Sequence, residues 1–177
     1  MASNPHTNFT KFTNLHNYGQ FKTEFKALTG KKMKTVSLAD RIVIQKIAYL
    51  LHKKGIYCAN YGDFSWYLHG VFCYDLWADT LKLEEPSVRE KAVEQGVLKE
   101  IRDFKDKLKK AGLTRYLTDS GKLELMTTIL YIAKKQENLN GNDDSFVERV
   151  KGLKDKFTEY EIRKIIGKLR EINWEFN

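Results

Sequence analysis

The sequence has very few of the residues that interrupt regular structure or crosslink a chain. Among its 177 residues are two prolines, two cysteines and eleven glycines. This composition argues against a low-complexity chain, and two cysteines are too few for a disulfide scaffold. Because 42% of the residues are hydrophobic and 12% aromatic, a disordered chain is also excluded. A chain of this length instead predicts one domain with its own core.

Long apolar runs are missing as well. A membrane-spanning helix needs roughly 20 apolar residues in sequence, and the longest candidate, residues 42–51, is interrupted by Gln45 and Lys46. The first residues also lack the basic segment followed by an apolar one that marks a secretory signal. We therefore expect a cytoplasmic protein that has no membrane partner.

The motifs of the common enzyme classes are absent too. The sequence has no Walker-type glycine loop, GxGxxG fingerprint, GxSxG elbow or HExxH pair. Cys73 lies near His69 and Asp75, but catalytic partners usually converge from separate elements, and burial in an apolar stretch would raise the pKa of this thiol. Of the histidines and cysteines between residues 52 and 73, only His69 and Cys73 approach the paired spacing of a zinc site. We expect no catalytic residue, no metal and no cofactor.

Helical patterns dominate the sequence. Residues 38–54 predict a buried helix, because Ser37 and Asp40 form a pattern close to a capping box and Gly55 follows two lysines as a stop signal. Apolar residues at helical spacing and capping signals predict further helices over residues 21–28, 72–81, 87–112 and 123–133, then from Ser145 and from Thr158 onward. Aromatic residues around a turn at residues 60–63 predict a hairpin. The expected fold is mainly α, a compact multi-helix single domain with a small β-hairpin near residues 56–68.

The net charge of +8 is unevenly distributed along the chain. Basic residues are in excess in residues 1–60 and 99–135, whereas residues 61–98 are acidic overall. Clustered lysines and arginines are the footprint of nucleic-acid binding, although such runs are more often solvated surface. The candidate phosphate contacts are Lys31, Lys32, Lys34, Lys99, Arg102 and Lys109.

Aromatic residues crowd both sides of Gly70. An extended segment followed by a helix cannot bury all of them, and exposed Trp or Tyr side chains supply large contact area at low entropic cost. The alternative is that all of them fill space between helices. The candidate partner-binding residues are Trp66, Tyr67, His69, Phe72 and Trp77.

Three segments resemble a known family. They are IQKIAYLL at residues 44–51, FSWYLHGVFCYDL at residues 64–76 and KDKFTEYEI at residues 154–162. The first two resemble the opening of the Panacea domain of SocA-like antitoxins and of the related YwgA-like proteins, and the third is similar to the family's capped last helix. The resemblance spans roughly residues 37–172, and we expect a Panacea-like helical domain over residues 31–177. Residues 1–30 precede it; their first 17 residues show no periodicity and predict an arm, which the short helix over residues 21–28 follows. The resemblance also implies a toxin–antitoxin module, mobile element or phage as the context, a toxin or other protein as the partner, and no catalytic residues.

Two functions remain open from the sequence. The first is an antitoxin-like or adaptor protein that binds a protein partner such as a cognate toxin, through the aromatic surface around residues 66–77. The second is a nucleic-acid-binding protein of winged-helix type that uses a basic face. An enzyme ranks third, since no motif supports one.

Overall fold

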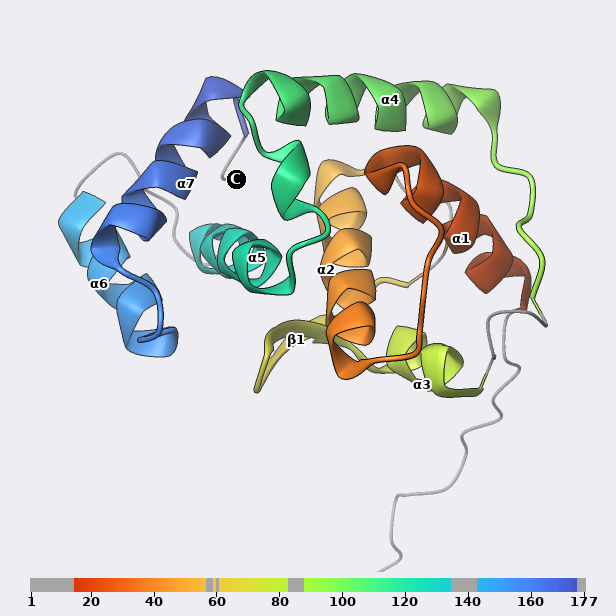
Figure 1. The fold of residues 1–177 in the computed structure, drawn as a ribbon, viewed down its shortest axis with the longest axis horizontal. Helices are drawn as coiled ribbons and strands as arrows, with labels where there is room; N and C mark the ends of the chain where they lie inside the picture. Colours follow the sequence, from red (N-terminus) through yellow and green to blue (C-terminus); the bar gives the residue numbers. More distant parts are fainter. Residues whose placement is uncertain (1–14, 57–58, 60, 83–87, 135–142, 175–177) are drawn as a thin grey trace, which may run out of the picture.

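The computed structural model describes residues 15–56, 59, 61–82, 88–134 and 143–174. The fold is mainly α, with one two-stranded antiparallel hairpin, as the sequence predicts (Figure 1). In chain order its elements are α1 (Leu15–Thr29), α2 (Leu38–Lys54), β1 (Phe64–Tyr67), β2 (Gly70–Cys73), α3 (Tyr74–Lys82), α4 (Gln95–Lys110), a short 3-10 helix η2 (Thr114–Tyr116), α5 (Ser120–Lys134), α6 (Asp143–Leu153) and α7 (Glu159–Glu171).

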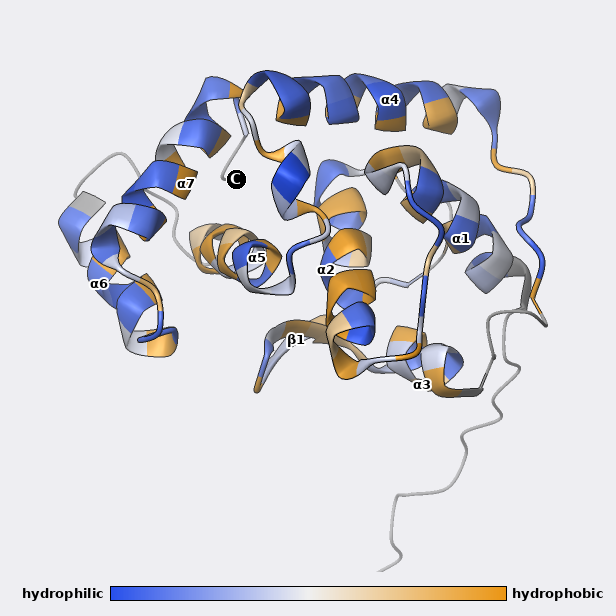
Figure 2. Ribbon diagram, viewed as in Figure 1, coloured by the Kyte–Doolittle hydropathy of each residue, from blue (hydrophilic) through white to orange (hydrophobic). Residues whose placement is uncertain are grey.

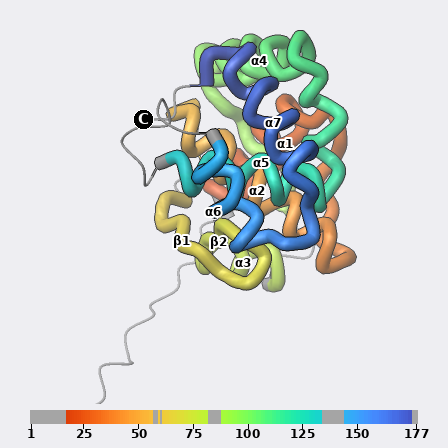
Figure 3. Tube along the Cα trace, turned by 90° about the vertical axis from the view of Figure 1, so that its left-hand side faces the viewer, coloured from red at the N-terminus to blue at the C-terminus, as the bar shows by residue number. Residues whose placement is uncertain are grey.

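Helix α2 is the central element of the fold. It packs against α5, β2, α1 and α3, and every residue from Ile44 to Leu51 is buried. Figure 2 shows the apolar colouring concentrated on α2 and α5. The sequence predicts this burial, because apolar residues cover most of the circumference of α2. The hairpin and α3 lie at one end of the molecule and α4 lies at the other (Figures 1 and 3).

Two helices begin with the capping boxes that the sequence predicts. At α2, the Ser37 hydroxyl accepts from the Asp40 amide, and the Asp40 carboxylate accepts from the Ser37 amide. Thr158 and Glu161 form the same reciprocal pair at α7. Helix α2 ends at Gly55, whose φ of 69° is the left-handed conformation that glycine adopts without strain.

The hairpin lies further along the chain than predicted. Its strands pair Trp66 opposite Val71 and Tyr67 opposite Gly70, so the turn is formed by Leu68 and His69 and not by residues 60–63. Residues 72 and 73, which the sequence placed at the start of a helix, belong to β2. The two-residue turn carries no Asn-Gly signal; the left-handed φ of 87° falls instead on Gly70, directly after it.

Three helix starts also differ from the sequence predictions. Helix α1 begins at Leu15, inside the predicted arm, and α6 begins at Asp143, two residues before the predicted cap Ser145. Helix α4 begins only at Gln95, whereas its predicted cap, Ser87, lies outside the described residues. The segment before α4 is held in a non-helical conformation by α1, because the Lys91 amide donates to the Gly19 carbonyl and the Lys22 ammonium donates to the Val88 carbonyl.

Helix α1 belongs to the same core as the rest of the described chain. It packs against α4 and α2, and its side chains Tyr18, Phe21, Phe25 and Leu28 are buried in one hydrophobic cluster with residues of the other helices. No helix in the described part of the chain has the length and apolar composition needed to cross a membrane.

Candidate binding surface

Helix α2 fixes the hairpin through the outer edge of β2. The Gln45 side-chain amide donates to the Cys73 carbonyl at 3.1 Å and accepts from the Cys73 amide at 2.8 Å. One residue further along α2, the Lys46 ammonium donates to the Val71 carbonyl at 2.7 Å. Unpaired strand edges are otherwise open to pairing with other chains, so these two side chains cover the edge of β2 and fix its position on α2.

Lys46 lies in a buried group of charges beneath the hairpin. On the neighbouring helix α5, the Glu124 carboxylate accepts from Lys154 at 2.5 Å and from Lys156 at 2.7 Å. Burial opposes the ionisation of Glu124, but these hydrogen bonds outweigh it and lower the pKa of the carboxyl. Burial lowers the pKa of Lys46 to about 7, although Glu124 acts in the opposite direction. The Lys154 ammonium also donates to the Leu68 carbonyl, so the group holds the hairpin turn as well.

The first candidate site is an apolar groove between the hairpin, the start of α2 and α3, which we call the hairpin groove. Its volume is about 470 Å³, within the usual range for ligand and anchor pockets. Its apolar lining includes Leu38, Ile42, Tyr67, Phe72, Tyr74 and Trp77. No carboxylate side chain is among its described lining residues.

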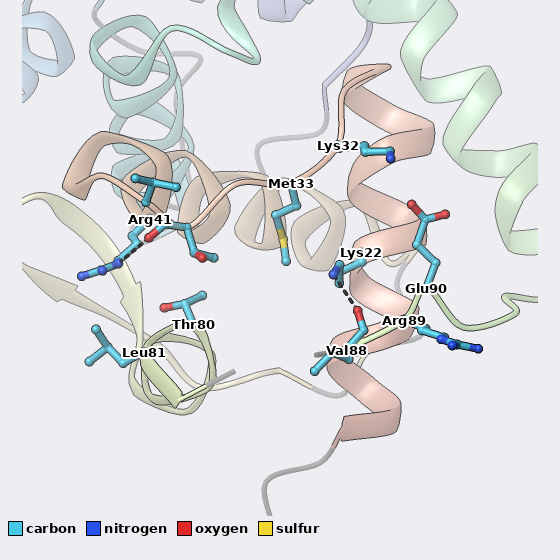
Figure 4. A pocket seen from close by; sticks show the side chains of 11 residues that line it. Lys22, Lys32, Met33, Arg41, Thr80, Leu81, Val88, Arg89 and Glu90 are labelled. Atoms are coloured by element: carbon cyan, nitrogen blue, oxygen red, sulfur yellow. Dashed lines mark hydrogen bonds between the residues drawn. The ribbon is translucent and has the colours of Figure 1, made fainter. Parts of the chain in front are cut away.

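The second candidate site, which we call the basic groove, lies between α1, α2 and α3 (Figure 4). Its volume is about 930 Å³. Met33 points into it, and Leu81 of α3 forms the opposite side. The basic side chains that line it come from four separate segments, and they are Lys22, Lys32, Arg41 and Arg89.

The two grooves adjoin at Arg41 and Trp77. Arg41 lines the basic groove, and its guanidinium carbon lies 5.8 Å from the ring centre of Trp77, which lines the hairpin groove. We call the two grooves together the docking face. Among the described residues, six of the eight exposed large hydrophobic side chains lie on this face, with exposed fractions from 51% to 85%. These six are Val36, Leu38, Tyr67, Leu68, Tyr74 and Leu81.

The structure brings together four of the five aromatic-segment candidates. Tyr67, His69, Phe72 and Trp77 all line the hairpin groove. Trp66 does not line it, because alternate residues of a strand point to opposite faces. Its ring instead packs 5.3 Å from that of Tyr131 on α5, beneath the Lys154 ammonium.

The basic candidates separate into two groups. Lys31, Lys32 and Lys34, between α1 and α2, line a smaller pocket together with Asp40, and Lys32 also lines the basic groove. The second group is exposed on α4 and lines neither groove of the docking face. It consists of Lys99, Arg102 and Lys109.

The described residues do not form the arrangement that a nucleophilic cysteine or a zinc site would need. Cys73 is buried in β2, and burial raises the pKa of its thiol, as expected. Among the described residues, no group of three or more His, Cys, Asp or Glu side chains could hold a metal ion. Cys58, one of the considered zinc ligands, lies outside the described residues.

No protein-family model, no curated protein and no solved structure matches this chain. The function must therefore be inferred from the chemistry of the docking face. Exposed apolar side chains beside basic ones can hold a macromolecule by burial of apolar surface and by charge pairing.

The sequence did not single out several residues of this face. Val36 and Leu38 carry no local signal of binding, and Leu81 belongs to the apolar spacing that predicts the helix over residues 72–81, where such residues usually serve the core. Arg41 and Arg89 are separated by 48 positions in the sequence and reach one groove only because α1, α2 and α3 converge there. A helical wheel of α2 would have placed Leu38 and Arg41 near each other, at i and i+3.

Proposed function

We propose that this chain is a cytoplasmic, non-enzymatic binding domain that recognises a protein partner through the docking face, as an antitoxin-like or adaptor protein. One observation carries the proposal: six of the eight exposed large hydrophobic residues in the described chain gather on this one face. Scattered exposed apolar residues are ordinary, but an apolar patch rimmed by polar residues marks a binding surface. The resemblance to the Panacea family supports a cognate toxin, encoded in a toxin–antitoxin module, mobile element or phage, as the partner.

The anchors of this face have the chemistry of protein interfaces. Tyr74 is 55% exposed on α3, and Trp77 lies one helical turn further on with its ring against Phe72 at 5.7 Å. Tyrosine, tryptophan and arginine are the residues that most often carry binding energy in protein complexes. Helix α2 holds the hairpin firmly through Gln45 and Lys46, so the anchors are positioned before the partner binds and little ordering entropy is lost.

The experiment compares two pairs of exposed apolar residues. Leu68→Ser with Tyr74→Ser removes anchors from the docking face, whereas Leu153→Ser with Tyr160→Ser removes a leucine and a tyrosine that are also at least half exposed and line neither groove. The tagged full chain and both variants are used for native pull-down from the source cell, and the captured protein is then purified and its affinity measured. We expect the first pair to lose at least about 2 kcal/mol of binding free energy with an unchanged melting temperature, and the second pair to bind as the parent chain does.

Two results would contradict the proposal. The partner could remain bound to the docking-face variant, or it could be lost only from variants that have also unfolded. Binding that disappears on nuclease treatment would support the second function, nucleic-acid binding, which the lysines of residues 31–34 favour. That binding should fall steeply between about 50 and 200 mM salt, because phosphate contacts release counterions.

A further inference from the structure

The two grooves differ in chemistry, and this difference indicates which side chains a partner would place in each. The described lining of the hairpin groove is mostly aromatic and aliphatic, with Lys46 and His69 as its basic members and no carboxylate. The apolar lining of the basic groove includes Met33 and Leu81. One carboxylate, Glu90, is among its described lining residues.

Among the described residues, three carboxylates on the segments around the basic groove are already paired. Glu90 accepts from Lys26 at 3.1 Å, and Asp40 accepts from the backbone and hydroxyl of Ser37 as part of the α2 cap. On α3, Asp79 accepts from the Tyr61 hydroxyl at 2.7 Å, pointing into the core. Within the described lining of the basic groove, the one carboxylate, Glu90, pairs with Lys26, so Lys32, Arg41 and Arg89 leave this groove with an excess of positive charge.

We propose that the docking face binds an acidic amphipathic segment of its protein partner, with apolar side chains in the hairpin groove and carboxylates over the basic groove. This inference rests on the proposed function and names the partner's chemistry. Lys32 and Arg89 lie on the α1 side of the basic groove (Figure 4), and Arg41 lies where the two grooves meet. A segment that crosses from one groove to the other would place carboxylates near these cations, where charge complementarity selects the partner.

The lining of the basic groove favours a protein segment over a nucleic acid. Proteins that bind single strands combine positive charge with aromatic rings on which bases stack. The described lining of the basic groove contains no aromatic side chain, and its uncharged members are aliphatic residues and threonines. Aliphatic surface between cations suits the leucines and carboxylates of an acidic amphipathic segment.

A displayed library of random 16-residue peptides, selected against the full chain at about 0.15 M salt, tests the inference. We expect the enriched peptides to combine Asp or Glu with Leu, Phe or Trp. Synthetic versions should bind Lys32→Glu with Arg89→Glu about tenfold or more weakly than the parent chain, since the reversed charges repel them. The matched control is Lys99→Glu with Lys109→Glu on α4, which makes the same charge change away from both grooves and should alter affinity less than about twofold.

Each alternative result overturns the inference in its own way. Enriched peptides that are neutral or basic, or acidic peptides that ignore the charge reversal, would reject the acidic segment. In that case, capture of a partner that still depends on Leu68 and Tyr74 would leave the proposed function standing.

A nucleic acid is the other outcome. It would be identified by a single-stranded 20-nucleotide DNA that binds more tightly than the peptides and whose binding is lost on charge reversal of Lys32 and Arg89. No enrichment, together with no loss of partner in the Leu68 and Tyr74 variant, would reject both proposals. Thermal melting of every variant confirms that it is folded, and the Lys32→Gln with Arg89→Gln pair replaces the reversal should the latter unfold.

Discussion

A single buried lysine couples the stability of this chain to pH. Lys46 is 2% exposed, and its ammonium donates to the Val71 carbonyl. Burial lowers its pKa from 10.5 to about 7; the Glu124 carboxylate opposes this shift, and the ammonium groups of Lys154 and Lys156 add to it. Between about pH 7 and pH 10.5 the unfolded chain therefore binds a proton that the folded chain has released. The contribution of Lys46 to the free energy of unfolding therefore rises with pH across this window.

Replacement of Lys46 by methionine should remove this pH dependence. We expect the free energy of unfolding of the parent chain, relative to Lys46→Met, to rise by up to about 1.4 kcal/mol per pH unit above pH 7, and to change little below about pH 6. Urea unfolding at several pH values between about 6 and 9 measures it. Lys122→Met, which changes a half-exposed lysine on α5, is the control and should leave the pH dependence unaltered. Parallel curves for the parent chain and Lys46→Met would show that Lys46 has an ordinary pKa.

Gln45 should contribute strongly to stability, because its side chain makes two hydrogen bonds to the buried backbone of Cys73. Gln45→Ala leaves both the amide and the carbonyl of Cys73 without their partner in a buried position. Each unsatisfied buried group costs about 1–3 kcal/mol, so for the two groups we expect a loss of roughly 2–6 kcal/mol and faster hydrogen exchange at the Cys73 amide. Gln20→Ala is the control, since its contact with the Ala92 carbonyl is 3.5 Å long and exposed. Equal losses in both variants would mean that Gln45 does not hold β2.

At the scale of the elements, local signals predict the helices well and the hairpin less well. The boundaries of α2 could be predicted because both its caps lie in neighbouring residues, Ser37 and Gly55. The strand pair depends on contacts that are distant in the sequence, above all the bonds from Gln45 to Cys73. The start of α4 depends on the bond from Lys91 to Gly19, 72 positions earlier. Such tertiary contacts override local propensity, and no local pattern encodes them.

Two glycines in or beside helices should respond in opposite ways to replacement by alanine. Gly167 lies inside α7 with nothing within 4 Å of an added Cβ, so Gly167→Ala should stabilise the chain by roughly 0.5–1 kcal/mol through helix propensity. Gly112, after α4, has a φ of 66°, and an added Cβ would lie 3.1 Å from the Lys168 ammonium. Gly112→Ala should therefore destabilise the chain by about 1 kcal/mol or more. Thermal melting of the two variants measures both effects, and a shift in the same direction would contradict this account.

At the scale of the whole molecule, the candidate site could be predicted only in part. The aromatic cluster around residues 66–77 identifies the hairpin groove, because too many rings are present for one hairpin and one helix to bury. The basic groove is not visible in the sequence, since its cations become neighbours only when α1, α2 and α3 pack together. Of the three lysines in residues 31–34, Lys32 alone is in the described lining of this groove. Trp66 could not be distinguished from Tyr67 before the strand register was known.

Phe21 can test whether residues 1–30 fold separately from the domain expected over residues 31–177. This α1 side chain is fully buried, and its ring lies 6.2 Å edge-to-face from both Phe25 and Tyr61. Tyr61 in turn donates to Asp79 of α3, so α1 is linked to α3 through aromatic packing and one buried hydrogen bond. A large cavity in a shared core destabilises every element that lines it.

Phe21→Ala should therefore destabilise the entire chain and not α1 alone. We expect a loss of about 3–5 kcal/mol, with one transition at the same midpoint by far-ultraviolet circular dichroism and by tryptophan fluorescence. The tryptophans Trp66, Trp77 and Trp174 lie outside α1, so their fluorescence reports on the rest of the fold. Phe21→Leu, which leaves a smaller cavity, should lose less stability while keeping the single transition. Should α1 unfold as an independent unit, circular dichroism would show an early partial loss of helix while the tryptophan signal melted at the midpoint of the parent chain.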